Sequence, residues 1–176
     1  MTFKTLDDAD LAGKRALVRV DLNVPMHEGE VSDDTRLRAA VPTIEKLRAA
    51  GATVILLAHF DRPKGKRVPE MSLGPIAVAL TKVLGSPVAF AEDTVGPAAH
   101  DAVDGLQPGQ VAVIENLRFN PGETSKDDAE RGEFADRLAA LADVYVGDGF
   151  GAVHRKHASV YDLPARLPHY AGYLIA

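Results

Sequence analysis

The 176-residue sequence predicts an α/β fold in three layers, a Rossmann-like, mainly parallel sheet with helices on both faces. Short apolar segments alternate along the chain with longer segments of helical periodicity, which is typical of βαβ units. The clearest apolar segment, residues 53–58, shows no polar alternation, as expected of a strand that is covered on both faces. Right-handed crossovers between such strands place helices on both sides of the sheet.

The first predicted strand is the apolar run at residues 16–18, which leads into polar side chains. Pro25 prevents its continuation because proline cannot donate to a strand ladder. Residues 28–30 form a polar, glycine-containing turn, which predicts a small hairpin that closes with Val31. Asp21 and Asn23 are therefore expected at the carboxyl end of a strand.

A helix is expected next, with Asp33 or Asp34 as its cap and Gly51 as its terminator. Its apolar positions recur at helical spacing: Leu37, Val41, Ile44 and Leu47. Arg36 then lies in the first turn of this helix. The strand at residues 53–58 follows and ends at His59.

The second half of the sequence repeats the alternation. A polar, basic loop at residues 60–67 precedes a helix at residues 73–84, and residues 85–87 end that helix. Further strands are predicted at residues 88–90, 111–114 and 144–146, and further helices at residues 96–103 and around Phe134 and Leu138. The apolar residues 170–176 are expected either to pack on the chain's own core or to mark a chain cut before a missing partner.

Length and composition favour one domain over residues 1–176. Hydrophobic residues make up 46% and charged residues 26%, as in folded globular proteins. The net charge of -5 gives no reason to expect nucleic acid or a membrane surface as a partner. The absence of cysteine excludes disulfides and cysteine nucleophiles. With no apolar run long enough to span a bilayer and no signal-peptide pattern, we expect a cytoplasmic protein.

Polar side chains follow four of the predicted strands. In an open parallel sheet, ligands bind in the crevice beyond the carboxyl ends of the strands. These ends carry Asp21, Asn23, His59, Arg62, Arg118, His154 and Arg155, and Arg36 joins them from the first helix. The planar guanidinium of arginine can donate paired hydrogen bonds to a phosphate or carboxylate group. Asp21 and Asn23 add acceptors for a hydroxyl. The sequence therefore predicts a site for a small phosphorylated, hydroxylated acid.

Several charged residues have simpler interpretations. Arg15 and Arg19 are expected to be solvated or ion-paired flanks of the first strand. Lys64, Lys66 and Arg67 are expected to form a solvated basic loop. His154 and His157 could cap backbone groups, and we expect no metal site because carboxylate and sulfur ligands are absent from that stretch.

Other chemistries lack their motifs. The sequence contains neither a G-x-x-x-x-G-K-[ST] phosphate loop nor a G-x-G-x-x-G pattern after the first strand. It also contains no G-x-S-x-G nucleophile elbow.

Five ordered motifs give the sequence a specific resemblance. They are RVDLNVP (19–25), DDTRLR (33–38), AHFDRPKG (58–65), ENLRF (115–119) and GDGFGAVHRKHAS (147–159). Together they resemble the amino-terminal half of phosphoglycerate kinase, essentially from end to end. The resemblance implies reversible transfer of the acyl phosphate of 1,3-bisphosphoglycerate to ADP in glycolysis, giving 3-phosphoglycerate and ATP.

The resemblance also implies roles for individual residues. Asp21 and Asn23 would hold the hydroxyl and carboxyl end of the substrate, and Arg36 would stabilise the phosphoryl group in flight. The anionic groups of the substrate would be contacted by His59, Arg62, Arg118 and Arg155, with His154, His157 and Gly151 in support. Mg-ADP or Mg-ATP would bind to a carboxyl-terminal domain absent from this chain, so this domain would hold no cofactor and would be inactive alone.

The sequence departs from the family pattern at three positions. Asp61 stands where the family usually has Gly, and Gly147 and Gly149 stand where it tends to have Asn and Ala. Residues before and after about position 110 also resemble different branches of the family. The alternatives are an engineered or recombined stand-alone α/β domain with only residual anion binding, and a non-catalytic Rossmann-like interaction module.

Overall fold

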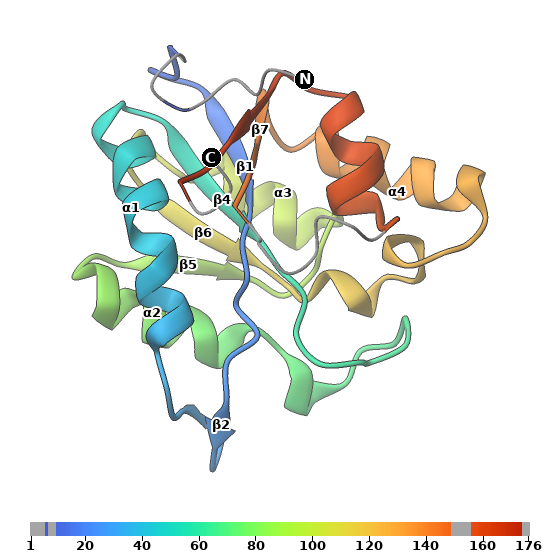
Figure 1. The fold of residues 1–176 in the computed structure, drawn as a ribbon, viewed down its shortest axis with the longest axis horizontal. Helices are drawn as coiled ribbons and strands as arrows, with labels where there is room; N and C mark the ends of the chain where they lie inside the picture. The colour runs from blue at the N-terminus through green and yellow to red at the C-terminus, as the bar shows by residue number, and fades with distance from the viewer. Residues whose placement is uncertain (1–5, 7–9, 149–155, 174–176) are drawn as a thin grey trace.

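The computed structural model describes residue 6, residues 10–148 and residues 156–173 of the chain. Its centre is a parallel sheet of six strands in the order β5-β6-β4-β1-β7-β8 (Figure 1). The strands are β1 (Arg15–Arg19), β4 (Thr53–Leu57), β5 (Val88–Ala91), β6 (Val111–Ile114), β7 (Val144–Gly147) and β8 (His169–Ala171). The predicted α/β class and parallel sheet are therefore confirmed.

Among the described residues, four α-helices cover the two faces of this sheet. They are α1 (Thr35–Ala49), α2 (Gly74–Leu84), α3 (Pro97–Asp104) and α4 (Asp128–Ala139). Successive residues of β1 point to opposite layers, because side chains alternate across a strand. Val18 packs in the core that contains α1 and α2, whereas Leu17 packs in the core that contains α3 and α4. The helices thus form the outer two of three layers (Figure 1).

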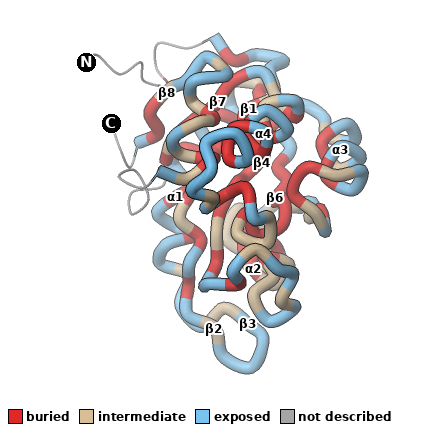
Figure 2. The backbone as a smooth tube through the Cα atoms, turned by 90° about the vertical axis from the view of Figure 1, so that its right-hand side faces the viewer, coloured by how far each residue is buried: buried red, intermediate tan, exposed pale blue. Residues whose placement is uncertain are grey.

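The central strands are buried along most of their length, which explains their apolar sequences. Every residue of β4 and β6 is buried, and β1 is exposed in part only at Arg15 (Figure 2). The predicted hairpin is confirmed as β2 (Met26–His27) paired antiparallel with β3 (Glu30–Val31). Its tip extends into solvent away from the sheet (Figure 2).

Helix α1 begins at the predicted aspartates. Asp34 occupies the capping position without a side-chain hydrogen bond to the backbone, while Asp33 Oδ1 accepts from the Thr35 N–H at 2.9 Å. Gly51 has a φ of 83°, which lets the chain reverse directly after the helix. Arg36 is therefore held in the first turn, as predicted.

The strand β8 was not predicted from the sequence. It pairs parallel with β7, and Tyr170 lies opposite Val146. Beyond it, the Tyr173 N–H donates to Thr43 Oγ1 on α1 at 3.0 Å. In the described part of the apolar tail, Tyr170 packs against the chain's own core and Ala171 is buried, whereas the side chain of Tyr173 is exposed. Within the described ranges, no helix is long and apolar enough to cross a membrane.

Candidate functional site

The carboxyl ends of three neighbouring strands meet at one edge of the sheet. Strands β6, β4 and β1 are adjacent and parallel, so the segments that follow them emerge side by side. These segments carry Asp21 and Asn23 after β1, His59 and Arg62 after β4, and Arg118 after β6. The sheet order thus brings together residues that lie far apart in the sequence.

Asp21, Asn23 and Arg36 contact one another. Arg36 Nη1 lies 3.5 Å from Asp21 Oδ1 and also donates to the Asn23 carbonyl oxygen. Asp21 Oδ1 in turn accepts from the Asn23 N–H at 3.0 Å. The predicted catalytic arginine therefore lies beside Asp21 and Asn23, the two residues expected to hold the hydroxyl and carboxyl end of the substrate.

A pocket of about 540 Å³ opens beside Arg36, between the β1 exit and the start of α1. Its lining includes Asn23 and Arg36 together with Asp33 and Thr35. Hydrogen bonds from the Thr35 hydroxyl and backbone N–H hold the pKa of Asp33 below its usual value. The lowered pKa favours the carboxylate form of Asp33, whose Oδ1 accepts both hydrogen bonds from Thr35.

Asp61 connects the β1 exit to Arg118. Its N–H donates to Asn23 Oδ1 at 3.4 Å, and its carbonyl oxygen accepts from Arg118 Nη1 at 3.0 Å. Its backbone φ is 58°, in the left-handed region where glycine is favoured, which explains why glycine suits this position. The Asp61 carboxylate accepts from the Arg62 N–H at 3.0 Å, a local bond that supports this conformation.

Two buried polar residues hold the loop after β4 against the turn after β6. Asn116 Oδ1 accepts from the Phe60 and Arg118 N–H groups, and its Nδ2 donates to the carbonyl oxygens of Phe60 and Met71. Glu115 accepts from the Leu73 N–H at 2.8 Å. Glu115 and Asn116 belong to one of the family motifs in the sequence, which predicts no role for them. Their signal was two polar residues directly after a fully apolar strand.

The expectation that Arg19 is a solvated or ion-paired flank of β1 is wrong. Its exposed fraction is 1%, and its guanidinium contacts Ser159 and His59. Arg19 Nε donates to Ser159 Oγ at 3.0 Å, and Ser159 Oγ donates to Glu123 Oε2 at 2.6 Å. Burial raises the pKa of Glu123, while the charge of Arg19 and the hydrogen bonds from Ser159 oppose this rise. Arg15 does match the expectation, with an ion pair to Asp104 at 3.1 Å.

The remaining predicted residues fall into two groups. Arg155, His154 and Gly151 lie outside the described residues. His157 precedes a helical turn, Ala158–Asp162, and its carbonyl oxygen accepts from the Tyr161 N–H at 2.8 Å. In the basic loop, Lys64 and Lys66 are exposed, whereas Arg67 Nη1 donates to the Glu92 carbonyl oxygen at 2.9 Å.

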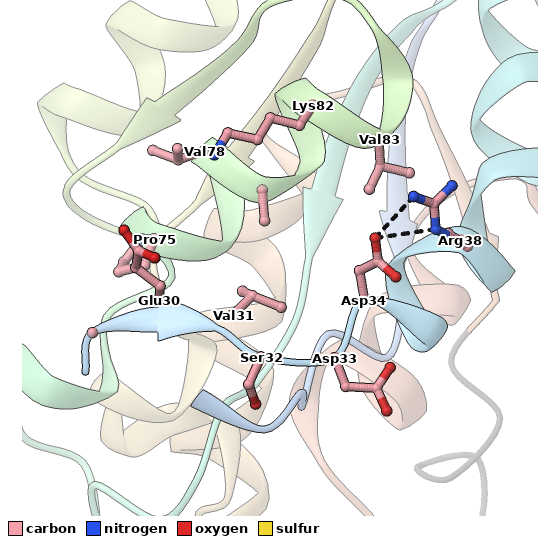
Figure 3. A pocket seen from close by; sticks show the side chains of 12 residues that line it. Glu30, Val31, Ser32, Asp33, Asp34, Arg38, Pro75, Val78, Lys82 and Val83 are labelled. Carbon is pink, nitrogen blue, oxygen red and sulfur yellow. Dashed lines mark hydrogen bonds and ion pairs between the residues drawn. The ribbon is translucent and has the colours of Figure 1, made fainter. Parts of the chain in front are cut away.

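A larger pocket, of about 860 Å³, adjoins the first at Asp33 and extends toward the hairpin and α2 (Figure 3). It is enclosed by the hairpin, the start of α1 and helix α2, and none of the predicted site residues is among its described lining residues. Asp34 and Arg38 pair across one wall at 3.0 Å, and Lys82 extends along α2 (Figure 3). Its charged lining combines three acids, Glu30, Asp33 and Asp34, with Arg38 and Lys82.

The chain was compared with known proteins. A family model for phosphoglycerate kinase matches residues 6–176. The phosphoglycerate kinase of Streptomyces avermitilis is 70% identical over 177 residues, covering 99% of this chain and 44% of that protein. The phosphoglycerate kinase of Caulobacter vibrioides strain NA1000 is 62% identical over 172 residues, covering 98% of this chain and 42% of that protein.

Solved structures give the same result. The crystal structure of phosphoglycerate kinase from Pyrococcus horikoshii OT3 has a TM-score of 0.87 at 31% identity, and the match covers 97% of this chain and 42% of that chain. Phosphoglycerate kinase from Coxiella burnetii has a TM-score of 0.85 at 36% identity, covering 98% and 42%. The chain thus spans less than half the length of the curated relatives it matches.

Proposed function

The chain belongs to the phosphoglycerate kinase family, and we propose that it binds the phosphoglycerate substrate of that enzyme. The ligands are 3-phosphoglycerate and 1,3-bisphosphoglycerate, whose acyl phosphate is transferred reversibly to ADP in glycolysis. The chain acts in the cytoplasm, with neither nucleic acid nor a membrane as a partner.

One observation carries this proposal: the contacts that connect Arg36, Asn23, Asp61 and Arg118 across three strand exits. Two arginines from different elements are held at the same edge of the sheet, where an anion of several oxygens can be bound by both. Hydrogen bonds to charged groups contribute about 1.5–3 kcal/mol each when well formed. Asp21 and Asn23 supply acceptors beside them for the substrate hydroxyl.

Arg36 is the proposed catalytic residue. Phosphoryl transfer is accelerated mainly by positioning and by neutralising the charge of the transferred group. The side chain of Arg36 is 53% exposed and lines the pocket beside Asn23, so its guanidinium can turn from its present partners to a phosphoryl oxygen. The attacking group is already a carboxylate or phosphate oxygen, and this half of the site needs no general base.

Catalysis requires the part of the enzyme that these 176 residues do not contain. We expect Mg-ADP and Mg-ATP to bind there, because a transfer needs both substrates in one closed site. The chain alone then binds substrate weakly and turns nothing over. Formation of ATP from 1,3-bisphosphoglycerate and ADP by the isolated chain would refute this part of the proposal.

Titration of the ¹⁵N-labelled chain with 3-phosphoglycerate tests the binding role. Amide shifts are expected at Asn23, Arg62, Arg118 and Arg155. Arg36→Ala should weaken binding. Arg38→Ala is the matched control, because Arg38 lies one half-turn further along α1 and pairs with Asp34 at the larger pocket instead.

The titration also separates the alternatives. Saturable shifts confined to the strand exits support the proposal. Shifts that inorganic sulfate reproduces at the same concentrations would instead indicate the residual anion binding of a stand-alone domain. No shift at any of the four amides would contradict the proposed function altogether.

A further inference from the structure

The imidazole of His59 is held by a buried arginine. Arg19 Nη2 lies 2.6 Å from His59 Nδ1, while Arg19 Nη1 donates to the Val20 carbonyl oxygen at 2.7 Å and Arg19 Nε donates to Ser159 Oγ. All three guanidinium nitrogens are therefore engaged, and the side chain is fixed in one orientation. His59 itself is partly buried at the β4 exit, next to the loop that carries Arg62.

The chemistry of the two groups sets the direction of their hydrogen bond. Arginine has only N–H donors and does not lose a proton in proteins. His59 Nδ1 must then accept, which it can do only as an unprotonated nitrogen. The proton of a neutral imidazole lies on its other nitrogen, Nε2, because the two ring nitrogens have complementary roles.

Ser159 connects Arg19 to a buried carboxyl group, and the charge of Arg19 opposes the rise that burial causes in the pKa of Glu123. Both oxygens of the Glu123 carboxylate accept from Ser159, one from the N–H at 2.8 Å and one from the hydroxyl at 2.6 Å. The Ser159 hydroxyl donates to Glu123 because it already accepts from Arg19. Since Arg19, Ser159 and Glu123 are all buried, none of them can exchange these partners for water without cost.

We infer that Arg19 is a positioning residue that fixes His59 as the neutral tautomer protonated on Nε2, so that His59 offers a hydrogen-bond donor to an anionic oxygen of the bound phosphoglycerate. This inference rests on the proposed function for its ligand. The tautomer itself is a property of the free chain and can be measured without any ligand. Arg19 contributes no contact to the substrate and acts through His59.

A long-range ¹H–¹⁵N spectrum of the free chain at pH 7 tests the tautomer. His59 Nδ1 is expected to show the signal of an unprotonated nitrogen and Nε2 that of a protonated one. The exposed His27, in the same spectrum, is the comparison histidine. In Arg19→Lys, one ammonium group cannot occupy all three positions, and the His59 signals should move toward the averaged values. An averaged or doubly protonated His59 in the unmodified chain would overturn the inference.

Two substitutions of His59 test what the tautomer does. The amide of His59→Gln can place a donor near the position of Nε2, whereas that of His59→Asn reaches only the position of Nδ1. We expect 3-phosphoglycerate binding to weaken about threefold in His59→Gln and about tenfold or more in His59→Asn, as for loss of a hydrogen bond to a charged group. Equal losses would overturn the donor role. If the tautomer is found but the unmodified chain does not bind 3-phosphoglycerate, the proposed function fails and the ligand part of this inference fails with it.

Discussion

Asp61, the expected departure from the family pattern, lies between Asn23 and Arg118 in the candidate site. Its backbone N–H and carbonyl group bridge Asn23 and Arg118, and its φ is 58°. Asp61→Gly keeps both backbone bonds, removes one negative charge and allows the left-handed conformation without a side chain. Lys64→Gly is the matched control. Lys64 lies in the same loop with the same φ of 58°, and its replacement removes a positive charge.

The two substitutions should have small effects on stability. A side chain in the left-handed region costs about 1–2 kcal/mol, and less for aspartate. Glycine offsets part of this gain, because the greater freedom of the unfolded chain destabilises the fold by about 0.5–1 kcal/mol. Asp61→Gly also loses the bond between Asp61 Oδ1 and the Arg62 N–H, a net contribution of about 0.5–1.5 kcal/mol. We therefore expect the free energy of unfolding to change by less than about 1.5 kcal/mol in both variants.

Their effects on substrate binding should differ in sign. At about one Debye length, roughly 8 Å, two unit charges in water interact by about 0.5 kcal/mol. A ligand with more than one negative charge should then bind the Asp61→Gly variant about two- to fivefold more tightly. Lys64→Gly should bind it with equal or lower affinity, because a favourable charge is lost.

Isothermal titration with 3-phosphoglycerate at low and high salt measures both effects. The difference between the variants should shrink at high salt, because exposed charges are screened. Weaker binding by Asp61→Gly than by the unmodified chain would refute the reasoning. It would mean that the Asp61 carboxylate orients a ligand-binding group instead of repelling the ligand.

The other predictions concern buried support, pH and catalysis. Asn116→Ala leaves four backbone groups without their partner, so the free energy of unfolding, measured by urea denaturation, should fall by about 3–4 kcal/mol. The control Asn120→Ala loses a single bond to the Gly122 N–H and should lower it by about 1 kcal/mol. Equal losses in the two variants would contradict the supporting role of Asn116. Thr35→Ala should raise the NMR titration midpoint of Asp33 toward 3.8, since the Thr35 hydroxyl is the main cause of its lowered pKa, and an unchanged midpoint would exclude that cause. The lowered pKa of Asp33 stabilises the fold above the unfolded-state value, and that stability is lost as the pH falls through the folded-state value. In an enzyme that joins this chain to the nucleotide-binding part, Arg36→Ala should lower kcat more than it weakens phosphoglycerate binding, and equal losses would give Arg36 a ground-state role.

Most of the fold could be predicted because its elements are defined locally. The apolar run of β4 and the terminators Gly51 and Gly85 each specify their element through neighbouring residues. Strand β8 could not be predicted, since a strand of three residues exists only through its pairing with β7. Pairing of this kind depends on tertiary contacts that no local pattern contains.

The candidate site could be predicted in part for the same reason. Parallel strands place their carboxyl ends at one edge, so Asn23 and Arg118 were expected near each other before the strand order was known. The buried role of Arg19 could not be predicted. Its partner Ser159 lies 140 positions further along the chain, and a charged residue at the end of an apolar strand usually faces solvent.

The most direct test of the proposed substrate site is a crystal structure of this chain with 3-phosphoglycerate bound. The ligand is expected at the exits of β1, β4 and β6, with its anionic groups on Arg36 and Arg118 and its hydroxyl beside Asp21 or Asn23. A ligand seated instead in the larger pocket between the hairpin and α2, or ordered without contact to either arginine, would contradict it.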